Sequence, residues 1–196
     1  MKTQTNTKFL AWMVLFACSC TKENIQQPSS ANMQSADDAV SSAAAFTIGQ
    51  SLNGGIIFYI DATMQHGLIA ATSDQGTGIS WNNGSNVVTN ATGTLVGTGL
   101  SNTKKITNTQ GKTGTYAALL CLNYKTGVYK DWYLPSKDEL NLLFQQRAVV
   151  GGLSGTNYWS SSEVSKGKAW DQEFGGGFQF KDTKSFTLNV RAISSF

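Results

Sequence analysis

The sequence is poor in the residues that build disulfides, metal sites and nucleophilic active sites. Its 196 residues include three cysteines and one histidine, His66. Two of the cysteines, Cys18 and Cys20, lie near the N-terminus, so Cys121 has no partner for an intradomain disulfide. Zinc sites and Ser-His-Asp or Cys-His sets need several such residues, and the composition therefore argues against them. We expect His66 to be a turn residue and Cys121 a small buried apolar one.

Charge and proline are also scarce. Charged residues make up 14% of the chain, against about 25% in typical soluble domains, and there are only two prolines. The formal net charge is +3, and it is +1 without Lys2 and Lys8, which lie near the N-terminus. So small a charge excludes a broad basic field for nucleic acid. The many glycine, asparagine, serine and threonine residues favour short strands and long loops over a helix bundle.

Long hydrophobic runs are absent, and the longest one, Phe9–Ala17, is too short to span a bilayer as a finished helix. It follows a positively charged start and leads to Cys18, which is typical of a lipoprotein signal peptide over residues 1–19. Lipidation at Cys18, with Cys20 as the rival acceptor, would anchor the protein to a membrane without spanning it. The alternative is an ordinary secretory signal with two incidental cysteines.

The rest of the chain divides into a tether and one domain. Residues 20–46 are small and polar, with no sustained apolar period, which is typical of a flexible linker. Residues 47–196 are numerous enough for one domain with a substantial core. We therefore expect an outer membrane lipoprotein that faces either the periplasm or the cell exterior.

The stretch Asp131–Glu173 contains the clearest helix start and three of the five tryptophans. Ser136 and Glu139 have the spacing of a capping box, in which each side chain bonds the backbone N–H of the other residue. Apolar residues follow at helical spacing. We predict a helix from this cap onward, packed on strands with Trp132 and Trp159 in the core.

Alternation and turn signals predict the other elements. Strands are expected at Gly54–Asp61, Leu68–Thr72, Tyr158–Ser162, Ala169–Phe174, Phe178–Lys181 and Phe186–Ile193, with a weak strand within Val87–Leu95. A further helix is expected at Thr115–Lys125, capped by Thr113 or Thr115 and closed by Gly127. The stretch Ser73–Thr109 is expected to be loop-rich. The predicted class is α+β, with two helices packed on a small mixed or antiparallel sheet.

Several of these segments resemble a known family. DWYLPSKDEL, YWSSSE and VRAI are similar to the Lcl C-terminal domain family, or DUF1566, while IGQSLNGGIIFYID, HGLIAATSDQ and GTGLSNTKKI resemble the form common in Bacteroidetes lipoproteins. The resemblance runs from about Thr47 to Phe196. It implies a C-type-lectin-like fold, related to formylglycine-generating-enzyme sulfatase domains, in which the terminal strands pair. The collagen-like adhesin that gives the family its name implies binding to glycosaminoglycans.

Acidic residues beside a tryptophan form the first candidate site. Asp171 and Glu173 alternate with Trp170, so both acids share one strand face. The arrangement is similar to the strand that holds calcium, and through it sugar, in C-type lectins. Calcium needs six or more oxygen ligands, which the sequence alone does not assemble. The alternative is an exposed polar strand face without metal.

Other candidate contacts are Trp81, in the stretch expected to be loop-rich, and four pairs of lysines along the chain. Trp81 either stacks on a ligand or belongs to the core. The paired lysines either stay solvated or gather into a patch for a sulfated or carboxylated glycan. These pairs are Lys104 with Lys105, Lys125 with Lys130, Lys166 with Lys168, and Lys181 with Lys184.

Three classes of function remain. The favoured one is a non-enzymatic, lectin-like binding module that recognises a glycan or a protein partner in adhesion, without a cofactor unless calcium is bound. The second is a carbohydrate-active enzyme that uses surface carboxylates. The third is a structural surface lipoprotein with no small ligand.

Overall fold

The computed structural model describes residues 45–196. The predicted signal peptide (1–19), the lipidation site at Cys18 or Cys20, and all but the last two residues of the predicted tether (20–46) lie outside the described residues. The described part contains four helices and nine strands, which confirms the α+β class. None of its helices is long and apolar enough to cross a bilayer. The C-type-lectin-like relationship stays a prediction.

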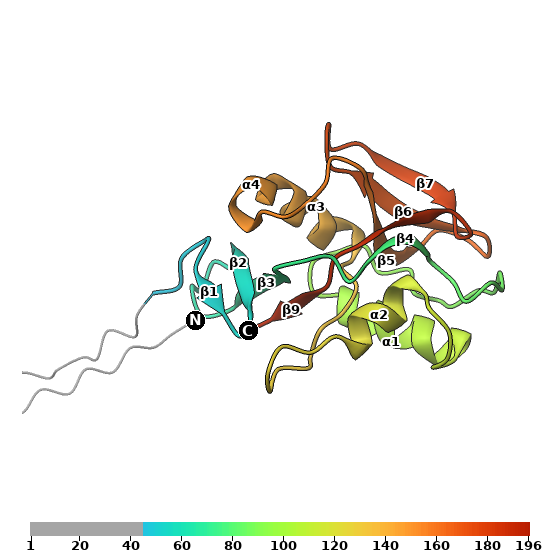
Figure 1. Cartoon of the computed structure of the whole chain (residues 1–196), viewed down its shortest axis with the longest axis horizontal. Helices are drawn as coiled ribbons and strands as arrows, with labels where there is room; N and C mark the ends of the chain where they lie inside the picture. The colour runs from blue at the N-terminus through green and yellow to red at the C-terminus, as the bar shows by residue number, and fades with distance from the viewer. Residues whose placement is uncertain (1–44) are drawn as a thin grey trace, which may run out of the picture. The chain divides into compact units, whose positions relative to one another are not determined.

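One sheet combines strands from the two ends of the described chain (Figure 1). In order across the sheet, its antiparallel strands are β1 (Ser51–Leu52), β2 (Gly55–Ile60), β3 (Gly67–Ala71) and β9 (Ile193–Ser195). The predicted hairpin between the first two apolar runs is confirmed, with His66 exposed in its turn. A Cβ at Gly55 would press on the Trp132 ring and the Ala70 carbonyl, so glycine allows this sheet to approach the core tryptophan.

The second sheet contributes the surface of interest. Its order is β4 (Gly76–Ser80), β8 (Thr187–Val190), β5 (Asn157–Glu163), β6 (Lys168–Glu173) and β7 (Gln179–Thr183). The β5–β8 pair is parallel and the other pairs are antiparallel. The prediction of one closing strand over Phe186–Ile193 is wrong, because the chain passes from the second sheet (β8) to the first (β9). The expected pairing of the terminal strands occurs through β3, not β2.

A buried arginine explains the break between these last two strands. Arg191 is fully buried, and its Nε donates to Asp74 Oδ1 at 2.7 Å. Its two terminal nitrogens donate to the carbonyls of Ala71 at 2.8 Å and Gly152 at 2.5 Å. The side chain therefore links the end of β3 and the loop after it to the segment between α4 and β5, and a regular strand would not place it there.

The helices number four in the described residues, two more than predicted: α1 (Gly99–Gln110), α2 (Ala117–Asn123), α3 (Lys137–Gln145) and α4 (Arg147–Val150). Figure 1 shows α1 and α2 at the bottom of the view, and α3 and α4 higher, at about the level of β6 and β7. The predicted helix at Thr115–Lys125 is present but shorter, and it lacks a side-chain cap. The capping box of α3 is confirmed.

The stretch Ser73–Thr109, expected to be loop-rich, is loop over residues 81–98, but it also contains β4 and most of α1, which were not predicted. The weak strand expected within Val87–Leu95 does not form. Helix α1 was missed because its buried side is mostly polar. Asn102, Thr103 and Thr107 are buried beside a single large apolar residue, Ile106. Such a face has no strong hydrophobic period, which is the signal that predicts a helix from sequence.

Tryptophans form the centre of the core. Trp132 and Trp159 are fully buried, as predicted, and they pack in one apolar cluster with Trp81, α2 and parts of both sheets. A second cluster lies between α3 and the strands, where Leu140, Leu143 and Tyr158 meet. Cys121 is also fully buried, in agreement with the expectation from the sequence.

Candidate functional site

The two faces of strand β6 carry different chemistry. Its side chains alternate, so Trp170 and Gln172 lie on the side of α3, whereas Asp171 and Glu173 lie on the other side. Gln172 bonds Asn141 of α3, and Lys137 of α3 lies over the Trp170 ring. We call the surface formed by Lys137, Trp170, Gln172, Gln179 and Lys181 the Trp170 face.

The start of α3 fixes one side of this face. The Ser136 backbone N–H donates to Glu139 Oε2 at 2.7 Å, and the Glu139 N–H donates to Ser136 Oγ at 3.3 Å. Glu139 Oε1 also accepts from the Gly97 N–H at 2.8 Å, just before α1. A Cβ at Gly99 would overlap Glu139 Oε2, so glycine is required for this approach. One carboxylate therefore holds the starts of both α1 and α3, although burial raises its pKa.

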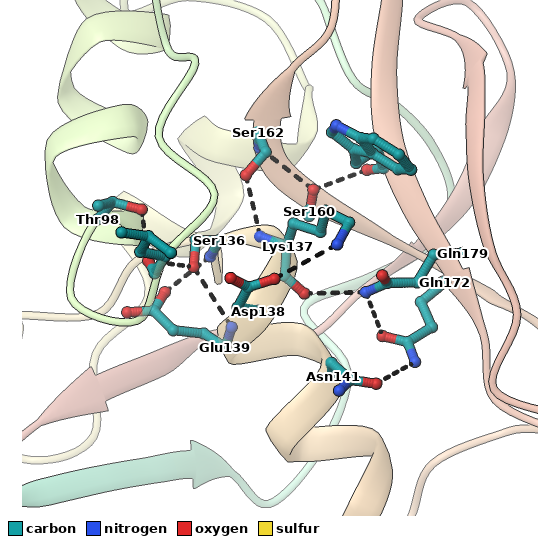
Figure 2. Close-up of polar contacts among 12 residues, drawn as sticks. Thr98, Ser136, Lys137, Asp138, Glu139, Asn141, Ser160, Ser162, Gln172 and Gln179 are labelled. Atoms are coloured by element: carbon teal, nitrogen blue, oxygen red, sulfur yellow. Dashed lines mark hydrogen bonds and ion pairs between the residues drawn. The ribbon is translucent and has the colours of Figure 1, made fainter.

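Two buried serines of β5, Ser160 and Ser162, connect α3 to the strand that carries Trp170 (Figure 2). Ser162 Oγ accepts from the Lys137 N–H at 2.9 Å, and Ser160 Oγ accepts from the Ser162 N–H at 3.2 Å. Ser160 Oγ in turn donates to the Trp170 carbonyl at 2.8 Å. These side chains are buried, so the contacts fix the position of α3 relative to β6.

Amide side chains complete the connection. Gln172 Nε2 donates to Asn141 Oδ1 at 2.9 Å, and Gln179 Nε2 donates to the Lys137 carbonyl at 3.1 Å and to Gln172 Oε1 at 3.2 Å. Figure 2 shows these amides between the helix start and the strands. Gln172 is buried and Gln179 half-buried, so the floor of the Trp170 face is preorganised.

Two lysines flank the half-buried indole. The Nζ atoms of Lys137 and Lys181 lie 5.0 and 4.9 Å from the centroid of the Trp170 ring, within the range of cation–π attraction. Lys181 is exposed, whereas Lys137 is half-buried and lies 3.4 Å from Asp138 Oδ1. Lys168 adds a third ammonium on the same side, with its Nζ 3.4 Å from the Lys181 carbonyl. Three cations against one carboxylate leave this surface positive.

The structure corrects the expectation that Trp81 contacts a ligand. Trp81 is fully buried, its Nε1 donates to the Ser160 carbonyl at 2.8 Å, and its ring lies 4.3 Å from Lys184 Nζ. Its indole has no free face for stacking. The core alternative, which the sequence left open, is the one observed.

The predicted calcium residues have other partners. Asp171 is buried, and its Oδ2 accepts from Asn157 Nδ2 at 2.7 Å while Oδ1 has no hydrogen-bond partner. Burial raises the pKa of Asp171 to about 6. Glu173 instead accepts the N–H groups of Gly175 and Gly176 at 2.6 Å each. In residues 45–196 no three His, Cys, Asp or Glu side chains are placed to hold a metal ion, and calcium binding stays a prediction.

The predicted lysines fall in separate places. Lys104 and Lys105 are exposed on α1, which packs against α2 and β5, and Lys105 Nζ donates to the Asn90 carbonyl at 3.0 Å. The pair Lys181 and Lys184 is divided, since Lys184 is fully buried against Glu163 Oε1 at 2.5 Å. Only Lys181 of these four contacts a tryptophan on the surface.

Sequence reasoning named Trp170 but missed the side chains around it. The period of two in Lys168, Trp170 and Gln172, repeated in Gln179 and Lys181, was the available signal that these residues share a face. Nothing in the sequence placed Lys137 beside them, because that contact depends on how α3 packs on β6. No pocket is found in residues 45–196, and the candidate site is a surface patch.

An α+β domain of two sheets with a preorganised aromatic and cationic patch defines the class of this protein. A family model described as the Lcl C-terminal domain matches residues 70–194, and the chain belongs to that family. The predicted resemblance is thereby confirmed. Strands β1 and β2 lie before the matched segment and extend its first sheet.

A solved structure shares this fold. It is a fimbrial protein from Bacteroides ovatus ATCC 8483, with a TM-score of 0.51 and 14% sequence identity. The similarity covers 78% of this chain and 45% of that one, so the present chain matches less than half of the fimbrial protein's length. No match was found among curated proteins. The family and the shared fold are compatible with an adhesion-type surface protein.

Proposed function

We propose that this protein is a cell-envelope binding module that recognises an acidic glycan through the Trp170 face, without chemical turnover. The supporting observation is the pair of lysine ammonium groups about the half-buried Trp170 ring. An indole offers a flat apolar surface to the C–H side of a sugar ring. The ammonium groups that lie over this ring attract the sulfate or carboxylate of the same sugar.

The amide side chains beside Trp170 are held rigidly, which favours a binding role for this surface. Gln179 is half-buried and is held by hydrogen bonds to the buried Gln172 and to the Lys137 carbonyl, so little side-chain entropy is lost when a ligand rests on it. Both amide N–H groups of Gln179 are engaged, and its side-chain oxygen is the acceptor that suits a carbohydrate hydroxyl group. Asp138, the one nearby carboxylate, is engaged with Lys137.

A glycan array tests this proposal with sulfated, carboxylated and neutral glycans. Acidic glycans should bind and neutral ones should not, and salt should weaken binding because exposed charges are screened. Trp170→Ala should reduce affinity about 5- to 30-fold, since one stacked ring contributes roughly 1–2 kcal/mol.

Matched lysine variants separate this surface from the rival one. The double variant Lys137→Gln, Lys181→Gln should lose binding, whereas Lys104→Gln, Lys105→Gln, with the same change of charge on α1, should retain it. If both double variants lost affinity equally, the loss would be explained by the change in net charge alone, and the proposed site would be contradicted. Binding that disappears on calcium chelation would instead favour Asp171 and Glu173. Turnover of any glycan would overturn the binding-only assignment.

We also propose that the protein is an outer membrane lipoprotein acylated at Cys18. The apolar run before Cys18 and the polar segment after it support this assignment. Cys18→Ser should release the protein from the membrane fraction, while Cys20→Ser should not. The reverse result would identify Cys20 as the acceptor.

A further inference from the structure

The connection between α2 and α3 forms a tight hairpin at one end of the domain. Thr126 and Tyr129 exchange two backbone hydrogen bonds, each of 3.0 Å, around a turn in which Gly127 has a φ of 57°. Thr126 Oγ1 also donates to the Asn53 carbonyl at 3.1 Å. The turn is therefore attached to the first sheet and is not a free loop.

The tip of this hairpin exposes apolar surface between basic residues. Val128 is 85% exposed, more than any other large apolar side chain in the described residues, and Tyr129 is 45% exposed. Lys125 and Lys130 flank the tip and are both exposed, and the exposed Asp131 follows, leaving a net charge of +1. Isolated exposed apolar residues are ordinary, but here an aliphatic and an aromatic residue form the outermost point of a fixed turn.

We propose that the hairpin tip, residues 125–130, docks on the surface of a bilayer that contains anionic lipid. Val128 would enter the boundary between headgroups and acyl chains, and Tyr129 has the apolar ring and polar hydroxyl that this boundary favours. Lys125 and Lys130 would contact lipid phosphates beside it. The backbone pairing of Thr126 with Tyr129 lowers the cost of drying the turn, because those N–H and C=O groups are already satisfied.

This docking would also orient the domain. In Figure 1 the connection between α2 and α3 projects at the bottom, whereas β6 and β7 lie at the upper right. A domain that rests on its hairpin tip therefore turns the strands of the Trp170 face away from the lipid. The inference stands on the hairpin alone and does not require the glycan proposal.

Site-specific fluorescence tests the contact. The full chain with Cys18 and Cys20 replaced by serine carries an environment-sensitive probe at Val128→Cys, or at Val149→Cys as the matched control. Val149 is a 48% exposed valine on α4, and Cys121 is buried and should not react with the probe. Each protein is added to phosphatidylcholine vesicles with or without phosphatidylglycerol. Emission should become stronger and shift to the blue at position 128 only, and only with the anionic lipid.

Charge variants and a second readout keep the test independent of labelling. Lys125→Glu with Lys130→Glu should lower partitioning by at least about 25-fold, or about fivefold per lysine, whereas Lys112→Glu with Lys104→Glu should leave it unchanged. Unlabelled Val128→Ser should reduce co-flotation with the anionic vesicles. A response that is equal at positions 128 and 149, or absent at 128, would overturn the proposal. So would a response insensitive to anionic lipid, because Lys125 and Lys130 would then contribute nothing to the contact.

Discussion

In the core, the ammonium group of Lys184 lies 4.3 Å from the centre of the Trp81 ring, while on the surface those of Lys137 and Lys181 lie 5.0 and 4.9 Å from Trp170. The buried lysine is also paired with Glu163, whose carboxylate accepts the N–H groups of the 89–90 backbone. The surface lysines have no such network. A lysine beside a tryptophan therefore stabilises the core at Trp81, whereas at Trp170 the same two residue types remain accessible for binding.

The largest effect should come from breaking the buried tie. Lys184→Met removes a cation that is 0% exposed and leaves Glu163 charged, with only backbone donors. Removing one partner of a buried ion pair costs about 3–5 kcal/mol in the free energy of unfolding. Urea denaturation measures this loss. If the free energy of unfolding fell by less than about 1 kcal/mol, Lys184 would contribute no more than an exposed ion pair does.

A second buried carboxylate should rank next. Glu139→Ala removes the acceptor of the Ser136 and Gly97 N–H groups and should lower the free energy of unfolding by about 2–3 kcal/mol. The control is Asp138→Ala, one residue earlier on the same helical turn but half-exposed, and its effect should stay below about 1 kcal/mol. Similar losses for the two variants would contradict the importance of burial.

The two faces of β6 make the comparison within one strand. The folded-state pKa of Asp171, about 6, lies above the ordinary value of 3.8 because the carboxyl is buried. The contribution of this group to stability is therefore fully present below the unfolded value and is lost as pH rises through about 6. Asp171→Asn should therefore stabilise the protein at pH 7 to 8 by about 1–2 kcal/mol and have little effect near pH 4. Thermal unfolding across this pH range provides the measurement. If the stability difference between Asp171→Asn and the unmodified protein instead grew as the pH fell, the raised pKa of Asp171 would be contradicted.

The smallest stability effect is expected on the Trp170 face. Lys181→Met removes an exposed cation–π contact and should change the free energy of unfolding by less than about 1 kcal/mol. The same variant should weaken binding of acidic glycans. Loss of stability comparable to that of Lys184→Met would indicate that the surface lysine is structural as well.

The sequence was informative where a local rule decides the structure. The Ser136–Glu139 spacing predicts the start of α3, and alternation predicts the β2–β3 hairpin, because both patterns depend on neighbours in the chain. Trp132 and Trp159 were predicted in the core from their place in a motif-rich stretch. The α+β class followed from these elements.

Tertiary contacts decided the rest. Helix α1 buries Asn102 and Thr103 against other segments, so its apolar period is weak and its existence depends on partners distant in sequence. Trp81 lies in the bend just after β4, and its burial could not be foreseen because neither β4 nor its partners in the core were predicted. Lys137 reaches Trp170 only through the packing of α3 on the second sheet, which no sequence spacing encodes.

The shared carboxylate of Glu139 has a dynamic consequence. Because it accepts N–H groups at the starts of α1 and α3, opening either helix start strips a donor from an acid already shielded from solvent. The two starts should therefore open in one cooperative event, and the amide protons of Gly97 and Ser136 should exchange with solvent deuterium at matching rates. Segments more than thirty residues apart would then behave as one unit of local unfolding.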